Sequence, residues 1–584
     1  MLDCNLCGNS QLVQEIDFAT LDESGLRSDL YNRPDLSHDT VDYLLPFPES
    51  PQTPVVFVID KSQFARNTGI FQSSLDAIGL VLEQGIVRKL VLIFLSEGVS
   101  YFQQATEYCV VDDSLVPVPV ASLIFNLPQD ASIIAKIVSA IKKRGLPERI
   151  LTVPVHALFG AIEVCSEGGK VYLFSARNID MTADDLKSAE SACATCSISV
   201  CAFVCPPNHV DVDLSLIGRL ASSTGGILRY YATDQVSSMG DDVIEDIERA
   251  EVTECAMKLR CSRGLSTCEV ISGLFTDVHP LEGFVIPRVR SDQSFVFILK
   301  HDASLDEATS VFLQLACSYV DETGAHKLRV STACIRMAAT SGNFFKFSDT
   351  DAICNVLLRQ TAFACLKGSD WLFKLRENLL LTCTGILQGY RANCSVRAPP
   401  GELVLPESLK NLPLMIQSIL KLPCFQEEAS MQKCQTYAFL FRCLESSIDL
   451  SSLILYTRIW QVTTEPPTMV PASIESLKPT QSYIMDTGTA LLLYPGSALA
   501  VTHDSDLVDQ LRLLSDRGHE SARTALSWTE HLQNSRTETL PRLKLRLIRH
   551  VKPMAEDAFG SNPCYADWLC ALHLRLQTSY IRIL

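Results

Sequence analysis

Hydrophobic and polar residues follow one regular pattern over the first half of the chain. From Pro51 to Arg249, short β-branched runs such as PVVFVID and KLVLIFL alternate with longer segments such as GIFQSSLDAIGLVLEQG. The short runs indicate buried strands, and apolar residues that recur every three or four positions indicate helices. Their alternation predicts a doubly wound α/β sheet over residues 51–249.

The pattern changes twice in the second half. Residues 250–345 contain period-two segments such as AMKLRC and SVFLQLACSYV without intervening helices, which predict an antiparallel β-sandwich. Residues 346–462 return to helical spacing. After the Pro-rich stretch TTEPPTMVP, residues 463–584 begin with two short strands and continue in helices. We therefore predict a multidomain protein with α/β, all-β and all-α parts.

Composition narrows the class of protein. The chain has 584 residues, 47% of them apolar, and a formal net charge of −17, so it is globular and nucleic acid is not a bulk partner. No apolar run approaches the roughly twenty residues that span a bilayer, and the first twenty residues lack the features of a secretory signal. We expect a soluble protein that meets a membrane only at its surface.

The chain contains 22 cysteines, scattered through apolar stretches, and most are expected to be small buried residues. Cys193 and Cys196 form a C-x-x-C pair that could be a redox or metal pair, but the motif leads directly into an apolar strand, and packing is the favoured interpretation. His156 at a predicted helix start is expected to be structural. No phosphate-binding, nucleotide-binding, nucleophile-elbow or metalloprotease motif occurs, so the sequence predicts no enzyme.

Two partial metal motifs stand out. The stretch VIDKSQF places Asp60 and Ser62 as in the D-x-S-x-S metal loop of von Willebrand A domains, but Phe64 stands at the second serine position. Phenylalanine supplies no oxygen ligand, so we expect an A-type sheet without its metal. Cys4 and Cys7 have the spacing of half a zinc site, and two cysteines cannot close a tetrahedral site.

Several stretches in this order resemble the COPII inner-coat family, cytosolic proteins that form vesicles leaving the endoplasmic reticulum. The stretches that resemble its cargo-adaptor subunit are CNLC, YNRPDLSHDTVDYLLP, VVDDSLVPVPVASLIFNL, AMKLRCSRGLS, SDQSF, LPESLKNLPLMIQSILK and MAEDAFGSNPCYADWLCALHLRLQ. The resemblance implies six parts: a remnant zinc ribbon at 1–30, a strand joining the sandwich at 31–50, an A-type trunk at 51–249, the β-sandwich at 250–345, a helical domain at 346–462, and a gelsolin-like domain with C-terminal helices at 463–584.

In this family the first cysteine pair of the ribbon lies upstream of the pair found here, and only three residues precede Cys4. Either the chain begins upstream of Met1 or the ribbon is degenerate. For the chain as written, we expect little or no bound zinc.

The resemblance implies an adaptor that selects cargo for transport from the endoplasmic reticulum to the Golgi. Its partners would be the sister inner-coat subunit in a heterodimer, a Sar-type small GTPase, the cytosolic tails of cargo and SNARE proteins, and an anionic membrane surface. It would act in the cytoplasm, in the COPII coat on the cytosolic face of the endoplasmic reticulum membrane. The alternatives are the GTPase-activating sister subunit, a generic scaffold of A-type and gelsolin-like modules, and a thiol or zinc enzyme built on Cys193 and Cys196.

The candidate cargo site lies in AMKLRCSRGL. Strand alternation places Lys258 and Arg260 on one face, about 7 Å apart, and directs their neighbours toward the core. A carboxylate favours such cations. The resemblance implies an acidic-signal pocket that combines this strand with residues near the ribbon. The further candidates are Arg263 at the following turn, Arg33, and, as a weaker one, Arg27.

A basic run, RLKLRLIRH, lies near the C-terminus and contains Arg542, Lys544, Arg546, Arg549 and His550. Such a run is most often a solvated helix face. The family's membrane-facing surface is basic, so contact with an anionic membrane is the alternative interpretation.

Overall fold

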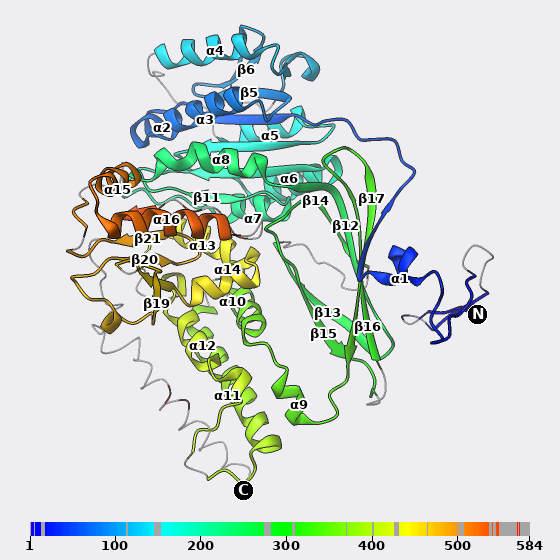
Figure 1. The fold of residues 1–584 in the computed structure, drawn as a ribbon. Helices are drawn as coiled ribbons and strands as arrows, with labels where there is room; N and C mark the ends of the chain where they lie inside the picture. Colours follow the sequence, from blue (N-terminus) through cyan, green and yellow to red (C-terminus); the bar gives the residue numbers. More distant parts are fainter. Residues whose placement is uncertain are drawn as a thin grey trace. The chain divides into compact units, whose positions relative to one another are not determined.

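The computed structural model describes residues 2–547, with gaps, and also residues 569 and 572 (Figure 1). The gaps are residues 5, 7, 13–17, 112–114, 145–153, 274–281, 306–309, 369–370, 400–401, 426–430, 464, 498, 502–506, 537–539, 541–542 and 544. The chain forms two compact units. The first consists of Met1–Ser291, Phe295–Met337 and Gln432–Arg442, and the second of Asp292–Ser294, Ala338–Met431 and Cys443–Leu584.

The first unit contains an eight-stranded sheet in the order β11-β10-β9-β4-β5-β6-β7, with β8 paired to β5. Its parallel strands are β4 (Val55–Asp60), β5 (Lys89–Leu95), β9 (Gly169–Ser175), β10 (Ile198–Val204) and β11 (Leu228–Tyr230). An antiparallel extension comprises β6 (Val99–Gln103), β7 (Thr106–Val110) and β8 (Phe125–Asn126). Every residue of β9 and β10 is buried, as expected of parallel strands covered on both faces.

Helices cover both faces of this sheet (Figure 1). On the face of Phe57 and Ile59 lie α3 (Ile70–Gln84), α4 (Ala131–Lys143) and α8 (Met239–Glu248). On the face of Val56 and Val58 lie α5 (Pro154–Val164), α6 (Ala183–Cys196) and α7 (Ser215–Ser223). The predicted doubly wound sheet is confirmed. The helix α6 was not predicted, because Leu186 is its one large apolar residue.

The β-sandwich pairs a five-stranded sheet, in the order β14-β12-β16-β17-β3, with the two strands β13 and β15. The strands are β3 (Thr40–Leu44), β12 (Glu251–Cys261), β13 (Leu265–Ile271), β14 (Phe284–Arg290), β15 (Val296–His301), β16 (Ser310–Val320) and β17 (His326–Arg336). The segment expected to join the sandwich supplies β3. The strand β14 was not predicted, because Pro287 interrupts its pattern; a proline is tolerated there because β14 is an edge strand.

A buried ion network joins the sheet to the sandwich. Lys170 Nζ on β9 lies 3.0 Å from Asp246 Oδ2 on α8 and 2.8 Å from Glu251 Oε2 on β12. The other Glu251 oxygen accepts from Arg288 Nη1 on β14 at 2.5 Å, and the Tyr172 hydroxyl donates to Asp246. Burial alone would raise the pKa of Asp246. The charge of Lys170 beside it outweighs this effect and lowers the pKa to about 2. The strands β9, β12 and β14 and the helix α8 therefore meet at one group of buried charges that neutralise one another.

A glycine pair lets β14 approach the sheet closely beside this network. Arg290 Nη1 donates to the carbonyl oxygen of Gly225 at 2.7 Å and to that of Gly226. An ideal Cβ on Gly225 would lie 1.8 Å from the Arg288 carbonyl oxygen, and the φ of Gly225 is +77°. Any other residue would push the two layers apart.

The second unit combines helices with a further sheet. The helices include α9 (Ser341–Lys346), α10 (Thr350–Lys367), α11 (Trp371–Cys394), α12 (Leu412–Lys421), α14 (Ile448–Leu455), α15 (Leu507–Asp516) and α16 (Glu520–Ser535). The sheet order is β19-β18-β20-β21-β22, with β18 (Arg458–Gln461), β19 (Thr468–Val470), β20 (Tyr483–Asp486), β21 (Leu491–Tyr494) and β22 (Leu545–Leu547). This sheet starts with β18, before the predicted boundary at residue 462. One more helix, α13 (Lys433–Glu445), crosses between the two units in sequence.

Two buried arginines hold the second unit together. Arg359 on α10 is fully buried and donates to the Ser294 hydroxyl at 2.8 Å, to the Ser294 carbonyl at 2.6 Å and to the Ser446 carbonyl at 3.5 Å. Arg536, which follows α16, lies 2.6 Å from Asp486 on β20, with both side chains less than a tenth exposed. Both arginines therefore tie segments that are distant in sequence.

The basic run near the C-terminus differs from its prediction. Its described part, β22, is a strand that pairs in parallel with β21, so the predicted helix is wrong at these residues. Alternating leucines fit the period of a strand: Leu545 is buried and Arg546 is half-buried. The other basic positions, Arg542, Lys544, Arg549 and His550, lie outside the described residues.

We predict that Lys170→Met lowers the free energy of unfolding of the first unit by about 3–5 kcal/mol at pH 7, because Asp246 and Glu251 lose their shared cation. Both carboxyl pKa values are lowered in the folded state. The stabilisation is therefore present above pH about 4 and is lost as the pH falls toward 2, so wild type and variant should converge there. Denaturant unfolding between pH 7 and pH 2.5 measures this.

The matched control is Lys187→Met, which removes a lysine whose side chain is 76% exposed and whose pairing with Asp184 is on the surface. Exposed pairs contribute about 0–1 kcal/mol, so this variant should unfold as wild type does. Equal stability of the Lys170→Met and Lys187→Met chains at pH 7 would contradict the role given to the network.

Candidate functional site

The outer face of the five-stranded sheet carries the two predicted cations. Lys258 and Arg260 on β12 are exposed, whereas Met257 is buried and Leu259 is half-buried, which confirms the predicted alternation. In the β16 ladder Lys258 lies opposite Ala316 and Arg260 opposite Gln314, so neither faces a charged residue on that strand. Within the described part of the chain, neither Lys258 nor Arg260 forms an ion pair.

A shallow cavity of about 270 Å³ opens on this face beside Lys258. It is lined by Ala256, Met257, Lys258, Glu282, Gly283, Phe284, Val285, Ala316, Ser318 and Leu328. Lys258 and Glu282 are its charged residues, and most of the remaining lining is apolar. The cavity therefore suits a small apolar side chain next to a carboxylate that Lys258 attracts. No local pattern in the sequence indicates this cavity, because its walls come from the four strands β12, β14, β16 and β17.

Arg263 takes part in a different arrangement, next to the N-terminal hairpin of β1 (Leu2–Asp3) and β2 (Ser10–Gln11). An ideal Cβ on Gly8 would lie 3.2 Å from Cζ of Arg263, so the guanidinium lies against the hairpin turn. Within that turn, Gly8 N donates to the Cys4 carbonyl at 2.7 Å and Cys4 N donates to the Asn9 carbonyl at 2.9 Å. The structure thus brings the remnant ribbon to the end of β12.

Arg27 and Arg33 each bind a neighbouring aspartate. Arg27 donates to both oxygens of Asp29 at 2.9 Å, and Arg33 donates to Asp35 at 3.0 and 2.6 Å. These hydrogen bonds lower the pKa of both carboxyls. To bind Arg27 or Arg33, a ligand carboxylate would have to displace the carboxylate of Asp29 or Asp35. No described contact joins this cluster to Lys258 or Arg260, so their convergence on one ligand stays a prediction.

The A-type metal position is filled by a side chain of the protein. Asp60, at the end of β4, is 1% exposed and accepts hydrogen bonds from Ser62 N and Oγ at 2.9 and 3.0 Å. Arg177 Nε and Nη2 donate to its two oxygens at 3.1 and 3.2 Å. The guanidinium supplies the positive charge that a divalent cation supplies in the D-x-S-x-S loop. Phe64 is 46% exposed and adds no oxygen ligand.

Among the described residues, no group of side chains completes a zinc site with Cys4. Cys4 is exposed, and Cys7 lies outside the described residues. In the described part of the chain, no three His, Cys, Asp or Glu side chains are grouped so that they could hold a metal ion. The next cysteine in the sequence after Cys7 is Cys109, so a second nearby pair is missing from the sequence as well.

The second C-x-x-C pair is part of the core. Cys193 and Cys196 lie in the last turn of α6, and the buried strand β10 begins two residues later, as predicted from the sequence. Cys193 is fully buried, and burial raises the pKa of its thiol. A redox thiolate needs the opposite end of a helix, where the dipole favours negative charge. The structure therefore supports packing over a thiol chemistry at these positions.

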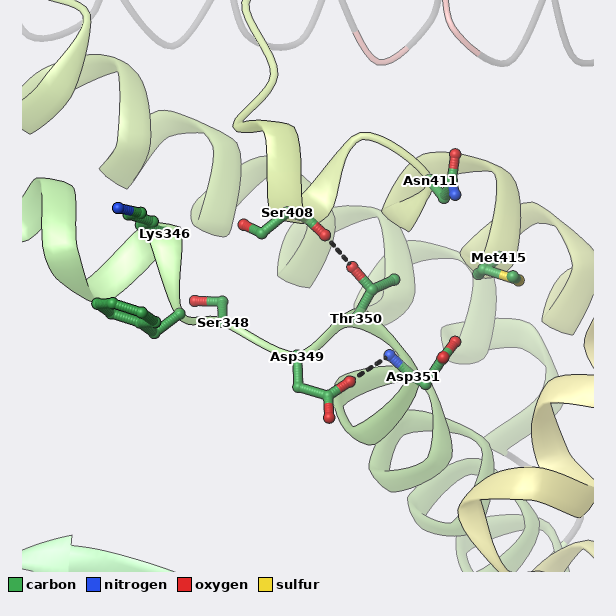
Figure 2. Close-up of a pocket in the computed structure, with 9 residues that line it drawn as sticks. Lys346, Ser348, Asp349, Thr350, Asp351, Ser408, Asn411 and Met415 are labelled. Atoms are coloured by element: carbon green, nitrogen blue, oxygen red, sulfur yellow. Dashed lines mark hydrogen bonds between the residues drawn. The ribbon is translucent and has the colours of Figure 1, made fainter. Parts of the chain in front are cut away.

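A second cavity, of about 450 Å³, lies in the second unit where α10 begins (Figure 2). Asp349 accepts from Asp351 N at 2.9 Å and from Ala352 N at 3.1 Å, and the Thr350 hydroxyl donates to the Ser408 carbonyl at 2.5 Å. These polar groups cap the helix and fix the preceding turn, which gives them a structural role.

Two family models match adjacent parts of the chain: the Sec23/Sec24 beta-sandwich domain over residues 252–338 and the Sec23/Sec24 helical domain over residues 349–453. The chain is 24% identical to protein transport protein Sec24C of Homo sapiens, covering 98% of this chain and 59% of that protein. It is also 24% identical to protein transport protein SEC24 B of Arabidopsis thaliana, covering 98% and 58%. The chain thus spans about three fifths of the length of these relatives.

The crystal structure of the human COPII-coat protein Sec24c superposes with a TM-score of 0.86 at 19% identity, covering 99% of this chain and 86% of that one. The β-sandwich and the helical domain of this chain are thus similar to those of the Sec23/Sec24 family, and an α/β sheet precedes them. The relatives that this chain matches over 98% of its length are Sec24 proteins, and its fold is that of Sec24c, so the resemblance found in the sequence is confirmed.

No helix among the described residues is long and apolar enough to cross a membrane.

We predict that Arg177→Ala destabilises the first unit by about 3–5 kcal/mol, because it leaves the buried Asp60 carboxylate without a cation. Chelation should leave wild type unchanged, since no ion is required at Asp60. Thermal unfolding with and without EDTA measures both effects. The control is Arg219→Ala, which removes a half-exposed arginine paired with Glu190 and should have little effect. A loss of wild-type stability on chelation would contradict the assignment.

We also predict that the chain as written retains little or no stoichiometric zinc, since a tetrahedral site lacks half its ligands. Elemental analysis of the purified chain after dialysis is the measurement, and a Cys4→Ser, Cys7→Ser chain gives the background level. One tight zinc ion per chain, lost in the double variant, would show that other residues complete the site.

Proposed function

We propose that the chain is a cargo-adaptor subunit of the COPII vesicle coat, which selects cargo for transport from the endoplasmic reticulum to the Golgi. The observation that carries the proposal is the likeness in fold to human Sec24c over 99% of the chain, described as a COPII-coat protein. The names of the Sec24 relatives, which are protein transport proteins, support the same conclusion and favour the adaptor over the GTPase-activating sister subunit.

An adaptor of this kind works through partners and has no catalytic activity of its own. The partners proposed are the sister inner-coat subunit, bound through the A-type domain, a Sar-type small GTPase, and the cytosolic tails of cargo and SNARE proteins. The protein would act on the cytosolic face of the endoplasmic reticulum membrane, with peripheral contact to anionic lipid. The net charge of −17 argues against a nucleic acid partner.

The proposed cargo site is the outer face of β12. Lys258 and Arg260 are exposed cations on alternate positions, about 7 Å apart, and can share the carboxylates of an acidic signal. The apolar cavity beside Lys258 would take a neighbouring side chain of the signal. Exposed charge pairs give weak contacts that are screened by salt, which suits cargo that must later be released.

We predict that Lys258→Glu combined with Arg260→Glu weakens capture of acidic tail peptides by about a hundredfold, taking each charge-assisted hydrogen bond as about 1.5 kcal/mol. The fold should persist, because both side chains are exposed. A binding assay with labelled tail peptides at low and moderate salt measures the loss, and thermal unfolding with sister-subunit binding reports the fold.

The matched control is Lys187→Glu combined with Lys300→Glu, which changes the net charge equally at two exposed lysines elsewhere in the first unit. This chain should capture acidic peptides as wild type does. Wild-type capture by the Lys258→Glu, Arg260→Glu chain would place the site elsewhere. Equal losses in both double variants would show that the loss comes from the change in net charge and not from these two positions.

A further inference from the structure

The strand β3 forms one edge of the five-stranded sheet. It pairs with β17 on one side, and among the described residues no strand pairs with its other side. Four of its five residues are exposed. An unpaired strand edge presents a row of backbone donors and acceptors to any extended chain that meets it.

The register shows which backbone groups are open. Leu45 N donates to the His326 carbonyl and Thr332 N donates to the Asp39 carbonyl, both at 2.8 Å. Because bonded and non-bonded pairs alternate in an antiparallel ladder, the odd-numbered residues of β3 bond to β17. The N–H and C=O groups of the even-numbered residues Thr40, Asp42 and Leu44 therefore point away from the sheet.

This edge lacks most of the features that usually block strand addition, and its one charged residue, Asp42, is already paired with Arg329. The sequence TVDYL contains no proline, lysine or glycine, and its pairing with β17 continues without a bulge. Tyr43 is 44% and Leu44 74% exposed, and Phe47 beyond the strand is 60% exposed. The opposite edge, β14, contains Pro287 and is tied down by its buried arginines. The edge at β3 is therefore open to an added strand, whereas the edge at β14 is not.

The side chains around the edge indicate which chain would fit. On the outer face, Val41 and Tyr43 lie opposite Val330 and Leu328, so apolar residues would pack there at alternate positions. On the other face, Asp42 accepts from Arg329 at 2.7 Å through both of its oxygens, yet its carboxylate stays partly exposed. A residue directly opposite Asp42 would therefore be neutral or basic.

A second copy of this chain is a poor occupant. An antiparallel pairing of two β3 strands through Thr40, Asp42 and Leu44 places Asp42 opposite Asp42 of the other copy. Like charges directly opposite each other destabilise a strand pair, and each chain carries a net charge of −17. The edge therefore favours a strand from a different protein.

We propose that β3 binds an extended segment of another protein, which adds a sixth strand to the sheet. The segment has apolar side chains at alternate positions and a neutral or basic residue opposite Asp42. Main-chain hydrogen bonds to Thr40, Asp42 and Leu44 hold it, and the apolar alternation sets its register. This surface is separated from Lys258 and Arg260 by two strands and takes a ligand of the opposite charge, so it does not depend on the cargo site.

The probe is the peptide KVTVKVTVK, acetylated and amidated, with a version that carries proline at the central position as its control. Binding to the full chain is measured by fluorescence anisotropy, and amide hydrogen exchange is followed at single-residue resolution. We expect the peptide to slow exchange at Thr40, Asp42 and Leu44. Exchange at Val41 and Tyr43, which are already bonded to β17, should change less. The proline version should bind at least about tenfold more weakly.

Two variants at one position separate backbone from side chain. Leu44→Pro removes one outward N–H and leaves the β17 ladder intact, and it should weaken peptide binding by about tenfold. Leu44→Ala keeps the N–H and should weaken binding by about threefold or less. Unchanged thermal unfolding confirms that both variants fold, and the exchange pattern of the wild-type chain tests the proposal even if Leu44→Pro does not fold.

Three results would overturn the proposal. The first is absence of peptide binding at millimolar concentration, and the second is binding without slower exchange at the outward amides of β3. The third is concentration-dependent dimerisation of the chain that protects the same amides, which would assign the edge to a second copy. Because the probe contains no carboxylate, none of these results bears on capture of acidic signals at Lys258 and Arg260.

Discussion

The buried charge network of Lys170, Asp246, Glu251 and Arg288 is the constraint on which the first unit depends. Each of these groups is costly to bury alone, so the sheet, α8 and two strands of the sandwich must all be in place before any of them is compensated. Glu251 is also the first residue of β12. The network therefore fixes the start of the strand whose outward residues form the proposed cargo site.

The chain compensates its buried charges from within and leaves certain surface groups open. Arg177 neutralises Asp60 and Arg536 neutralises Asp486, each by direct hydrogen bonds. Near the ribbon remnant, Arg27 and Arg33 likewise bind the aspartates beside them. The exposed cations of β12 and the open backbone of β3 both lie on one sheet. That sheet thus combines a fixed inner face with an outer surface available to partners.

The doubly wound sheet, the sandwich and the outward pair on β12 could be predicted because local periodicity encodes them. The elements that were missed had weak local signals: α6 is mostly polar, β14 contains Pro287, and the leucines around Arg546 fit either a strand or a helix. The compensating partners could not be predicted at all. Arg177 is 117 positions from Asp60, and nothing in a local pattern links them. The neutralisation of Arg27 and Arg33 depends on side-chain conformations that spacing alone does not determine.

The buried guanidinium of Arg359 has a consequence for how the protein is made. Its hydrogen-bond acceptors are Ser294, which lies 65 residues before it, and Ser446, which lies 87 residues after it. During synthesis, the helix that carries Arg359 leaves the ribosome well before Ser446 exists. The helix must therefore keep that side chain in water, or share it with other acceptors, until the later segment arrives. Closure of the second unit is for this reason a late event in the life of the nascent chain, and a fragment that ends between α10 and α13 would lack Ser446, the acceptor that arrives last.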